Sequence, residues 1–276
     1  MTTLTNKIDF ALIFTAKNSN PNGDPLGGNR PRTTSDGLGE VSDVCLKRKI
    51  RNRLQEMGEA IFVQMQDNAD DGKQSLSERY NDFKLTLDKE DQKDSKFVTS
   101  KVCEKWIDVR SFGQVFAFKK SDEGKEVSIG VRGPVTIQSA FSTEPVIVES
   151  IQITKSVNSE TTAEGKKDAS TMGMKHRVSS AVYVTYGSIT PQLAEKTGFS
   201  DKDAQLIKDA LLNIFTGDES SARPSGSMVV NNVVWVEHNN KSGQYSSAKV
   251  HNSIKVDKEG RLSVDKLENL NYEILE

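Results

Sequence analysis

The fold of this chain is decided by the segment NSNPNGDPLGGNRPRTTSDGLGEVSDVCLKRKIRNR, residues 18–53. Its first half is a loop of Asn, Gly, Pro and Asp, residues that favour tight or left-handed turns and hydrogen-bond to their own backbone. Its second half predicts a helix with basic flanks. The apolar run from Ile8 to Thr15 leads into the loop and indicates a central strand. This arrangement suits a polyanionic ligand, although such loops are also common on protein surfaces.

The predicted helix has one buried face. Ser42 or Asp43 is its expected cap, because a short oxygen-bearing side chain satisfies free N–H groups. Apolar residues then follow at spacings of four, four, three and four, which places them on one side: Leu46, Ile50, Leu54, Met57 and Ile61. Cations flank this stripe, either as solvated side chains or as phosphate contacts: Lys47, Lys49, Arg51 and Arg53.

Charge is distributed unevenly along the chain. The formal net charge is -2, which argues against a protein that coats nucleic acid with its whole surface but allows a local basic groove. Residues 30–53 hold seven Lys or Arg residues against three acids, Asp36, Glu40 and Asp43. The acids gather instead between Asp67 and Asp94.

The bulk composition indicates a globular chain with polar insertions. Hydrophobic residues make up 35% and charged residues 28% of 276 residues, which is enough to bury a real core. We find no apolar run near the ~18 residues that a membrane helix needs, and no signal-peptide pattern at the N-terminus. The two cysteines, Cys45 and Cys103, have no metal-ligand spacing around them. We therefore expect no disulfide framework, and a cytoplasmic location.

The middle of the chain alternates polar insertions with ordered pieces. Residues 64–96 predict an inserted surface segment with weak order, with short amphipathic helices as the alternative. Residues 97–118 predict a short helix and then a strand near Gly113. A β-rich stretch follows and is broken at Gly133-Pro134. Residues 156–171 predict a long loop with almost no apolar content.

The second half predicts two strong strands around a helix. The strands are Val178 to Ile189 and Met228 to His238. Between them Ser200 is the expected cap, with Asp203 as its capping-box partner, and Gly217 is the expected end of the helix. The tail beyond Asn239 is polar, with room for a short hairpin.

The order of strong elements is β-α-β-β-α-β, which predicts an α+β fold with a ferredoxin-like or RNA-recognition-motif core. We expect one elaborated domain, with a palm core at about residues 7–62, 97–155 and 172–238 and polar insertions at about 64–96 and 156–171. The aromatic signature of ordinary RNA-recognition motifs is absent. Any RNA contact is therefore expected from loops and basic residues.

No catalytic constellation is present. The three histidines, His176, His238 and His251, have no metal spacing, and no nucleophile-elbow, H-E-x-x-H or phosphate-loop pattern occurs. Asp24 lies in the key loop, yet NGDP is also ordinary turn chemistry. We therefore expect no enzyme, no metal and no cofactor.

Several blocks, in this order, resemble the Cas-seven family of the RAMP superfamily, the backbone subunit of type I CRISPR Cascade, and its type I-C branch most. The blocks are NPNGDPLGGNRPR with SDVCLKRKIRN, then DVRSFGQVFAF, VRGPVTIQSAFSTEPV, MGMKHRVSSAVYVTYG and AEKTGFSDKDAQLIKDALLNIF. The resemblance extends to about Glu237 and implies a hand-shaped protein with a modified RNA-recognition-motif palm, inserted fingers and a thumb. It implies no nuclease activity.

The resemblance also implies partners: CRISPR RNA, a target DNA strand paired with that guide, further copies of the chain, and Cascade subunits of the Cas-five and large-subunit families. Such a subunit in antiviral defence holds the RNA backbone and leaves sequence to base pairing. The candidate RNA-binding residues are Asn20, Asn22, Asn29, Arg30, Arg32, Lys47, Lys49 and Arg51, with Arg110, Gln138, Ser139, Lys175, His176 and Arg177 as weaker candidates. For Arg110 an ion pair with Asp108 or another acid is the alternative.

Two other classes stay open. The first is a metal-dependent RNA endonuclease of the type III kind, with Asp24 or Asp36 as the acid. The second is a protein-only structural subunit that uses the basic helix for docking. Replacing Lys47, Lys49 and Arg51 together by Ala is expected to weaken RNA binding without unfolding the protein.

Overall fold

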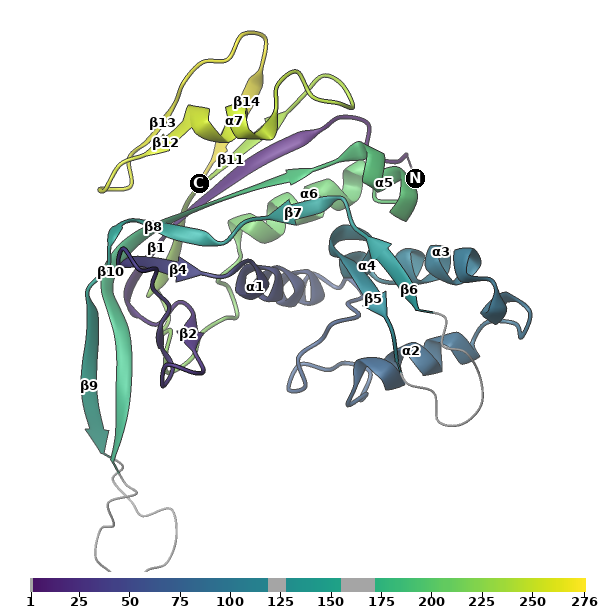
Figure 1. The fold of residues 1–276 in the computed structure, drawn as a ribbon, viewed down its shortest axis with the longest axis horizontal. Helices are drawn as coiled ribbons and strands as arrows, with labels where there is room; N and C mark the ends of the chain where they lie inside the picture. The colour runs from purple at the N-terminus through teal and green to yellow at the C-terminus, as the bar shows by residue number, and fades with distance from the viewer. Residues whose placement is uncertain (1, 119–127, 155–171) are drawn as a thin grey trace, which may run out of the picture.

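Strand β1 (Ile8–Ser19) lies at the centre of the main sheet, where its apolar residues are buried on both faces. The computed structural model describes residues 2–118, 128–154 and 172–276, so the loop predicted at 156–171 lies outside the described residues. Strand β1 pairs antiparallel with β10 (Met172–Ile189) and with β11 (Met228–Glu237). The predicted central strand and the two late strands are thus neighbours (Figure 1).

The rest of the sheet is built outward from these three strands. Its order is β14-β11-β1-β10-β8-β4, and β7 and β9 also pair with β10. The additional strands are β4 (Leu38–Val41), β7 (Val135–Ile137), β8 (Ala140–Pro145), β9 (Val148–Thr154) and β14 (Asn271–Leu275). Their pairings are all antiparallel. The fold is therefore mixed α+β around a central antiparallel sheet, as predicted.

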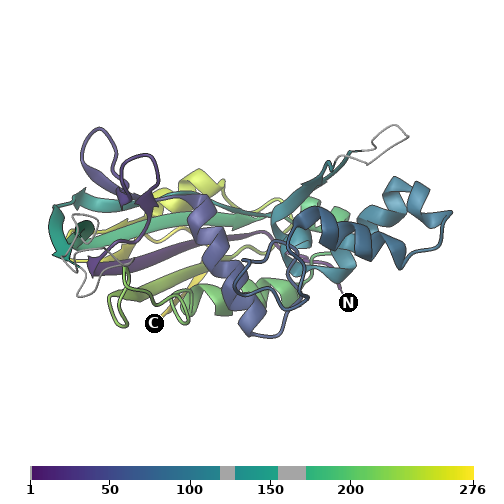
Figure 2. The same ribbon diagram turned by 90° about the horizontal axis from the view of Figure 1, so that it is seen from below.

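Two helices cover one face of the sheet. Helix α1 (Asp43–Glu56) and helix α6 (Asp201–Leu212) pack on Phe10, Leu12 and Phe14 of β1, because alternate strand residues point to the same face. Figure 2 shows α1 crossing the strands on this side. The chain order β1, α1, β8, β10, α6, β11 keeps the predicted β-α-β-β-α-β sequence of elements.

The C-terminal tail covers the opposite face. Ala11 and Ile13 of β1 pack there against Val250 and Ile254, which belong to helix α7 (Ser247–Ser253) and strand β12 (Ile254–Val256). Strands β12 and β13 (Leu262–Val264) form the hairpin that the tail was expected to allow. The addition of β14 to the main sheet was not predicted. This face is consequently closed to stacking of nucleobases over the central strands.

The segment predicted as weakly ordered contains a helix. Helix α2 (Leu76–Leu85) and the short helix η1 (Asp91–Lys93) lie within residues 64–96. Tyr80 and Phe83 of α2 join a second hydrophobic cluster with Phe62, Val102 and Trp106. The elements that complete this unit are α3 (Ser95–Lys105), α4 (Ile107–Phe112), β5 (Gly113–Phe116) and β6 (Ile129–Arg132). The unit extends beyond one end of the sheet (Figures 1 and 2).

The predicted helix caps are confirmed, while two helix ends differ from the prediction. The Ser42 hydroxyl accepts a hydrogen bond from the Cys45 amide, and Ser200 forms a full capping box with Asp203. Helix α1 ends at Glu56, so Ile61 is buried outside it. Helix α6 ends at Leu212 and not at Gly217, whose positive φ of 76° instead serves a later turn. Short helix α5 (Pro191–Thr197) precedes α6. Within the described ranges, none of the helices is long and apolar enough to cross a membrane.

Candidate nucleic-acid interface

A small hairpin projects from the loop that follows β1. Strand β2 (Gly23–Asp24) pairs with β3 (Arg30–Pro31), and both the Gly27 and Asn29 amides donate to the Asp24 carbonyl. Asn29 has a left-handed φ of 61°, a conformation that Asn tolerates. A Cβ on Gly23 would lie 1.9 Å from the Asn29 side-chain oxygen, so any larger residue there would displace the Asn29 side chain. The Asn- and Gly-rich sequence thus specifies one tight turn.

Two of the predicted contact residues brace this hairpin. Asn20 is 97% buried and donates through Nδ2 to the Asn29 carbonyl at 2.7 Å. The Asn22 side-chain oxygen accepts from the Ser42 amide at 3.0 Å and from its hydroxyl at 2.9 Å. These bonds fasten the loop to itself and to the start of α1. Both side chains therefore act mainly as supports, where the sequence had predicted sugar or phosphate contacts.

The hairpin exposes cations beside this braced frame. Arg30 is exposed and Arg32 is half-buried, and neither has a carboxylate partner among the described residues. Lys17 at the end of β1 is exposed nearby and was missed by the sequence reasoning, because a single Lys in a strand carries no pattern. Lys47 on α1 is half-buried and pairs with Asp43 at 3.0 Å. Arg30 and Arg32 are consequently the predicted cations whose charge is most available.

Lys49 does not lie on the surface. Its side chain is 3% exposed, and its ammonium pairs with Asp218, which lies after α6. The ammonium also lies 5.8 Å from the centroid of the Phe215 ring. Burial lowers the pKa of Lys49, while the charge of Asp218 opposes that shift. The predicted phosphate contact at Lys49 is corrected: the residue sits beside the apolar stripe and stabilises the packing of α1 on α6.

Two further arginines are also engaged in internal ion pairs. Arg51 Nε lies 2.9 Å from Asp108, whose side chain is 1% exposed. Arg110 lies 2.7 Å from Asp203, the capping-box partner of Ser200 at the start of α6. The acid that pairs with Arg110 is therefore distant in sequence, and Asp108 is taken by Arg51. Both arginines hold α4 against its neighbours, which gives them a structural role, and the RNA contacts expected there stay a prediction.

Gln138 and Ser139 form the short link between β7 and β8. The Gln138 amide donates to the Tyr186 carbonyl at 2.8 Å, and its carbonyl accepts from the Thr185 hydroxyl at 2.7 Å. The Gln138 side chain is exposed and that of Ser139 is half-buried. The backbone here is thus fixed to the sheet while the Gln138 side chain faces solvent.

The basic cluster Lys175, His176 and Arg177 lies within β10, which begins at Met172, earlier than predicted. Arg177 pairs with Glu149 at 2.8 Å, and His176 Nδ1 lies 2.9 Å from the Ser150 hydroxyl. Both partners belong to β9. These contacts stabilise the two-stranded ribbon of β9 and β10, which projects from the body (Figure 1).

This ribbon exposes several apolar side chains. Ile153 is 48% exposed, and Met172 and Met174 are 59% and 54% exposed. Ile153 faces Gly173 and Met174 faces Gln152 across the ladder, so the apolar side chains lie on both sides of the ribbon. Exposed apolar residues on a projecting ribbon indicate an interaction surface.

Among the described residues, Asp9 has two histidines beside it, His238 and, at 3.7 Å, His251, and all three lie inside the protein. Asp9 accepts from His238 Nε2 and from Lys7, each at 2.9 Å, and both Asp9 and His238 have fully buried side chains. His238 Nδ1 accepts from the Gln244 amide, which fixes its tautomer. Burial tends to raise the pKa of Asp9, yet the bonds from His238, Ser247 and Lys7 hold it below its ordinary value. The pair anchors the C-terminal segment and reaches no substrate.

Comparison with known proteins gives this geometry a context. A relative from Haloferax volcanii, "CRISPR-associated protein Cas7", is 28% identical over 222 residues, which cover 75% of this chain and 63% of that protein. The chain thus spans less than two thirds of that relative's length. Two solved structures are titled "CRISPR RNA-guided surveillance complex, pre-nicking" and "CRISPR RNA-guided surveillance complex". They match with TM-scores of 0.47 and 0.44, at 17% and 20% identity; both cover 83% of this chain, and 78% and 68% of the matched chains.

The family model described as CRISPR-associated protein Cas7 matches residues 6–274, from the start of β1 to the end of β14. This match includes the hairpin, helix α1 and the β9–β10 ribbon. The chain belongs to the Cas7 family.

Proposed function

We propose that this chain binds CRISPR RNA as a non-catalytic backbone subunit of a type I Cascade complex, of the I-C branch, in the cytoplasm. One observation carries the proposal. Arg30 and Arg32 stand on a hairpin braced by Asn20 and Asn22, and neither cation has an acid partner among the described residues. Cations on a rigid loop bind backbone phosphate without the cost of ordering the loop itself.

The proposed recognition is independent of sequence. A guide-holding subunit has to accept any spacer, so it is expected to contact phosphate and sugar and to leave base edges free. The sheet face that RNA-recognition motifs use for stacking is covered here by α7 and β12. This supports a modified RNA-recognition-motif palm whose RNA surface has moved to the loops at the start of α1.

We assign the β9–β10 ribbon to the thumb of this hand-shaped fold. Its exposed Ile153, Met172 and Met174 suit contact with unstacked bases, which present apolar faces. In the family the thumb displaces one base at regular intervals. The assignment gives a role to apolar side chains that would otherwise be costly to leave in water.

The proposed assembly is a row of copies along the guide, which then pairs with a target DNA strand. A net charge of -2 suits a subunit that stacks on further copies, because repulsion between copies is small. The other partners expected from the family are Cascade subunits of the Cas-five and large-subunit families.

The nuclease alternative has a specific weakness at Asp24. One Asp24 side-chain oxygen accepts from the Leu26 amide at 3.2 Å, so it is used to stabilise the turn. Asp36 is exposed, and within the described residues there is no group of three or more His, Cys, Asp or Glu side chains that could hold a metal ion. The described surroundings of either acid therefore offer no preformed set of metal ligands.

The direct test is the affinity of the purified protein for several RNAs of one length and unrelated sequences. Equal affinities that fall steeply with added salt are expected, because binding to phosphates releases counterions. Affinities that differ strongly between sequences, or that do not respond to salt, would contradict the proposal.

A further inference from the structure

We infer that Arg223, together with Arg32, binds one backbone phosphate of the guide RNA, and that Asp218 and the buried Lys49 hold Arg223 in position. This inference rests on the proposed function and deepens it. Arg223 lies in the loop between α6 and β11, far in sequence from the basic segment at residues 30–53. The pattern that predicted the other cations therefore gave no signal for it.

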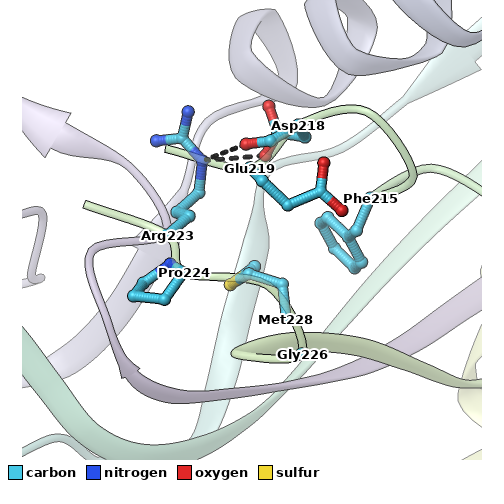
Figure 3. A pocket seen from close by; sticks show the side chains of 7 residues that line it. All are labelled: Phe215, Asp218, Glu219, Arg223, Pro224, Gly226 and Met228. Atoms are coloured by element: carbon cyan, nitrogen blue, oxygen red, sulfur yellow. Dashed lines mark hydrogen bonds and ion pairs between the residues drawn. The ribbon is translucent and has the colours of Figure 1, made fainter. Parts of the chain in front are cut away.

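Arg223 is oriented by a carboxylate on one side only. Its Nε donates to the Asp218 carboxylate at 2.8 Å, and the two terminal nitrogens point away from that carboxylate (Figure 3). The side chain is 26% exposed. Among the described residues no acid pairs with those terminal nitrogens, so they remain able to form a bidentate contact. Phosphate oxygens have the geometry that such a fork recognises.

Asp218 is itself held by a second cation. Its carboxylate also pairs with the buried ammonium of Lys49. Lys49 is therefore a brace for the site, which explains why a cation of the basic helix faces inward. A side chain held in this way loses little rotamer freedom when it binds an anion.

The two arginine-bearing loops are bonded to each other. The Asn20 amide donates to the Ala222 carbonyl at 2.8 Å, and the Arg32 amide donates to the Asn22 carbonyl at 3.0 Å. The Cys45 thiol lies where both loops meet α1: burial raises its pKa, and the charges of Lys49, Arg223 and Arg32 all oppose that shift. Arg32 and Arg223 thus share one neighbourhood next to the hairpin.

The ion pairing in this neighbourhood leaves the arginines able to bind an anion. Arg32, Arg223 and Lys49 carry three positive charges against the one negative charge of Asp218. Glu219 also lines the adjacent pocket, but its carboxylate points toward Phe215 and away from Arg223 (Figure 3). Glu40 is a third acid beside Arg32, because its amide donates to the Arg32 carbonyl at 2.9 Å, so three cations face three acids. The formal charges cancel, and an anion would be bound through the guanidinium nitrogens that no acid pairs with among the described residues.

The cavity beside Arg223 is too small to hold a base. Its volume is about 30 Å³, which admits one or two waters and no nucleobase. A ligand that reaches the guanidinium therefore comes from the open side. The backbone of a single strand that runs past the hairpin presents phosphates in this way.

The test compares four proteins by RNA affinity across a salt series: wild type, Arg223→Ala, Arg32→Ala and the double variant. Each single substitution is expected to weaken binding about tenfold, in line with the loss of a charge-assisted hydrogen bond. Because both arginines are assigned to one phosphate, the double loss is expected to differ from the product of the single losses by more than about twofold. Arg223→Lys keeps the charge and is expected to retain the salt slope with lower affinity.

Arg261→Ala is the matched control, because Arg261 is an exposed arginine on the C-terminal hairpin, which covers the opposite face of the sheet. It is expected to bind RNA like the wild type, and thermal unfolding of each variant checks the fold. Unchanged affinity in Arg223→Ala, or single losses that multiply independently, would overturn the inference while RNA binding by the wild type still supports the proposed function. A wild-type protein that binds no RNA would overturn both.

Discussion

The ion pair between Arg51 and Asp108 gives the sharpest stability prediction. Asp108 is 1% exposed and accepts from Arg51 Nε at 2.9 Å, from the Phe62 amide at 2.7 Å and from the Val63 amide at 3.0 Å. Arg51→Ala removes the cation that pairs directly with this buried carboxylate and leaves only the longer-range charges of Arg48 and Arg79. Breaking one side of a buried pair costs about 3–5 kcal/mol. For a chain of this size each kcal/mol lowers the melting temperature by about 2–4 °C, so we expect a fall of about 6–20 °C.

Thermal unfolding followed by circular dichroism measures this fall, with Lys47→Ala as the matched control on the same helix. Lys47 pairs with Asp43 at the surface, a contact worth about 0–1 kcal/mol, so its loss is expected to change the melting temperature little. The earlier expectation that Lys47, Lys49 and Arg51 can be replaced together without unfolding is therefore revised. An Arg51→Ala protein as stable as the Lys47→Ala protein, with a lower salt slope for RNA binding, would refute this reasoning.

Three further outcomes are expected. Replacing Arg30 and Arg32 together by Ala should lower the slope of log affinity against log salt by about 1.4, at about 0.7 per phosphate contact, and should leave the melting temperature unchanged. RNA titrations at several salt concentrations measure this slope. An unchanged slope would show that the hairpin is not part of the RNA site. Wild type and Asp24→Ala should leave RNA equally intact with Mg²⁺ on a denaturing gel, whereas a product made only by the wild type would support the nuclease alternative. Burial lowers the pKa of His251 below 6.5, so the folded state keeps it neutral while the unfolded chain takes up a proton below that pH. The free energy of unfolding should therefore decrease as the pH falls below about 6.5, less so in His251→Gln; equal pH profiles for the two proteins would contradict this.

The sequence predicted the parts of the fold that depend on local patterns. The apolar run of β1, the stripe of α1 and the capping box of Ser200 and Asp203 each involve residues within a few positions of one another. The physical causes are likewise local, because caps and amphipathic faces act within one or two turns. The ends of α1 and α6 were missed by a few residues, since the apolar spacing continues into the turns that follow.

The sequence could not predict which cations are buried. Lys49 and Asp218 lie 169 positions apart, and Arg110 and Asp203 lie 93 apart, so no local pattern joins them. On a helical wheel Lys49 looks like any solvated cation beside an apolar stripe, and only the packing of α6 on α1 shows that it faces inward. Arg223 was missed because its place beside the hairpin likewise depends on a contact between loops that are distant in sequence.

The addition of β14 and the ordering of α2 also depend on distant partners. Strand β14 is short, lies in the polar tail and gains its place by pairing with β11. Helix α2 buries Tyr80 and Phe83 against Trp106, while its other residues are mostly polar. In both segments tertiary contacts outweigh a weak local preference.

The central claim is most directly tested by light scattering of the protein alone and with CRISPR-type RNAs of increasing length, at low and moderate salt, followed by a gel of the recovered RNA. A backbone subunit predicts a mass that rises in steps with RNA length, and RNA that stays intact. A mass that does not change with RNA length, or RNA that is recovered cleaved, would contradict the account.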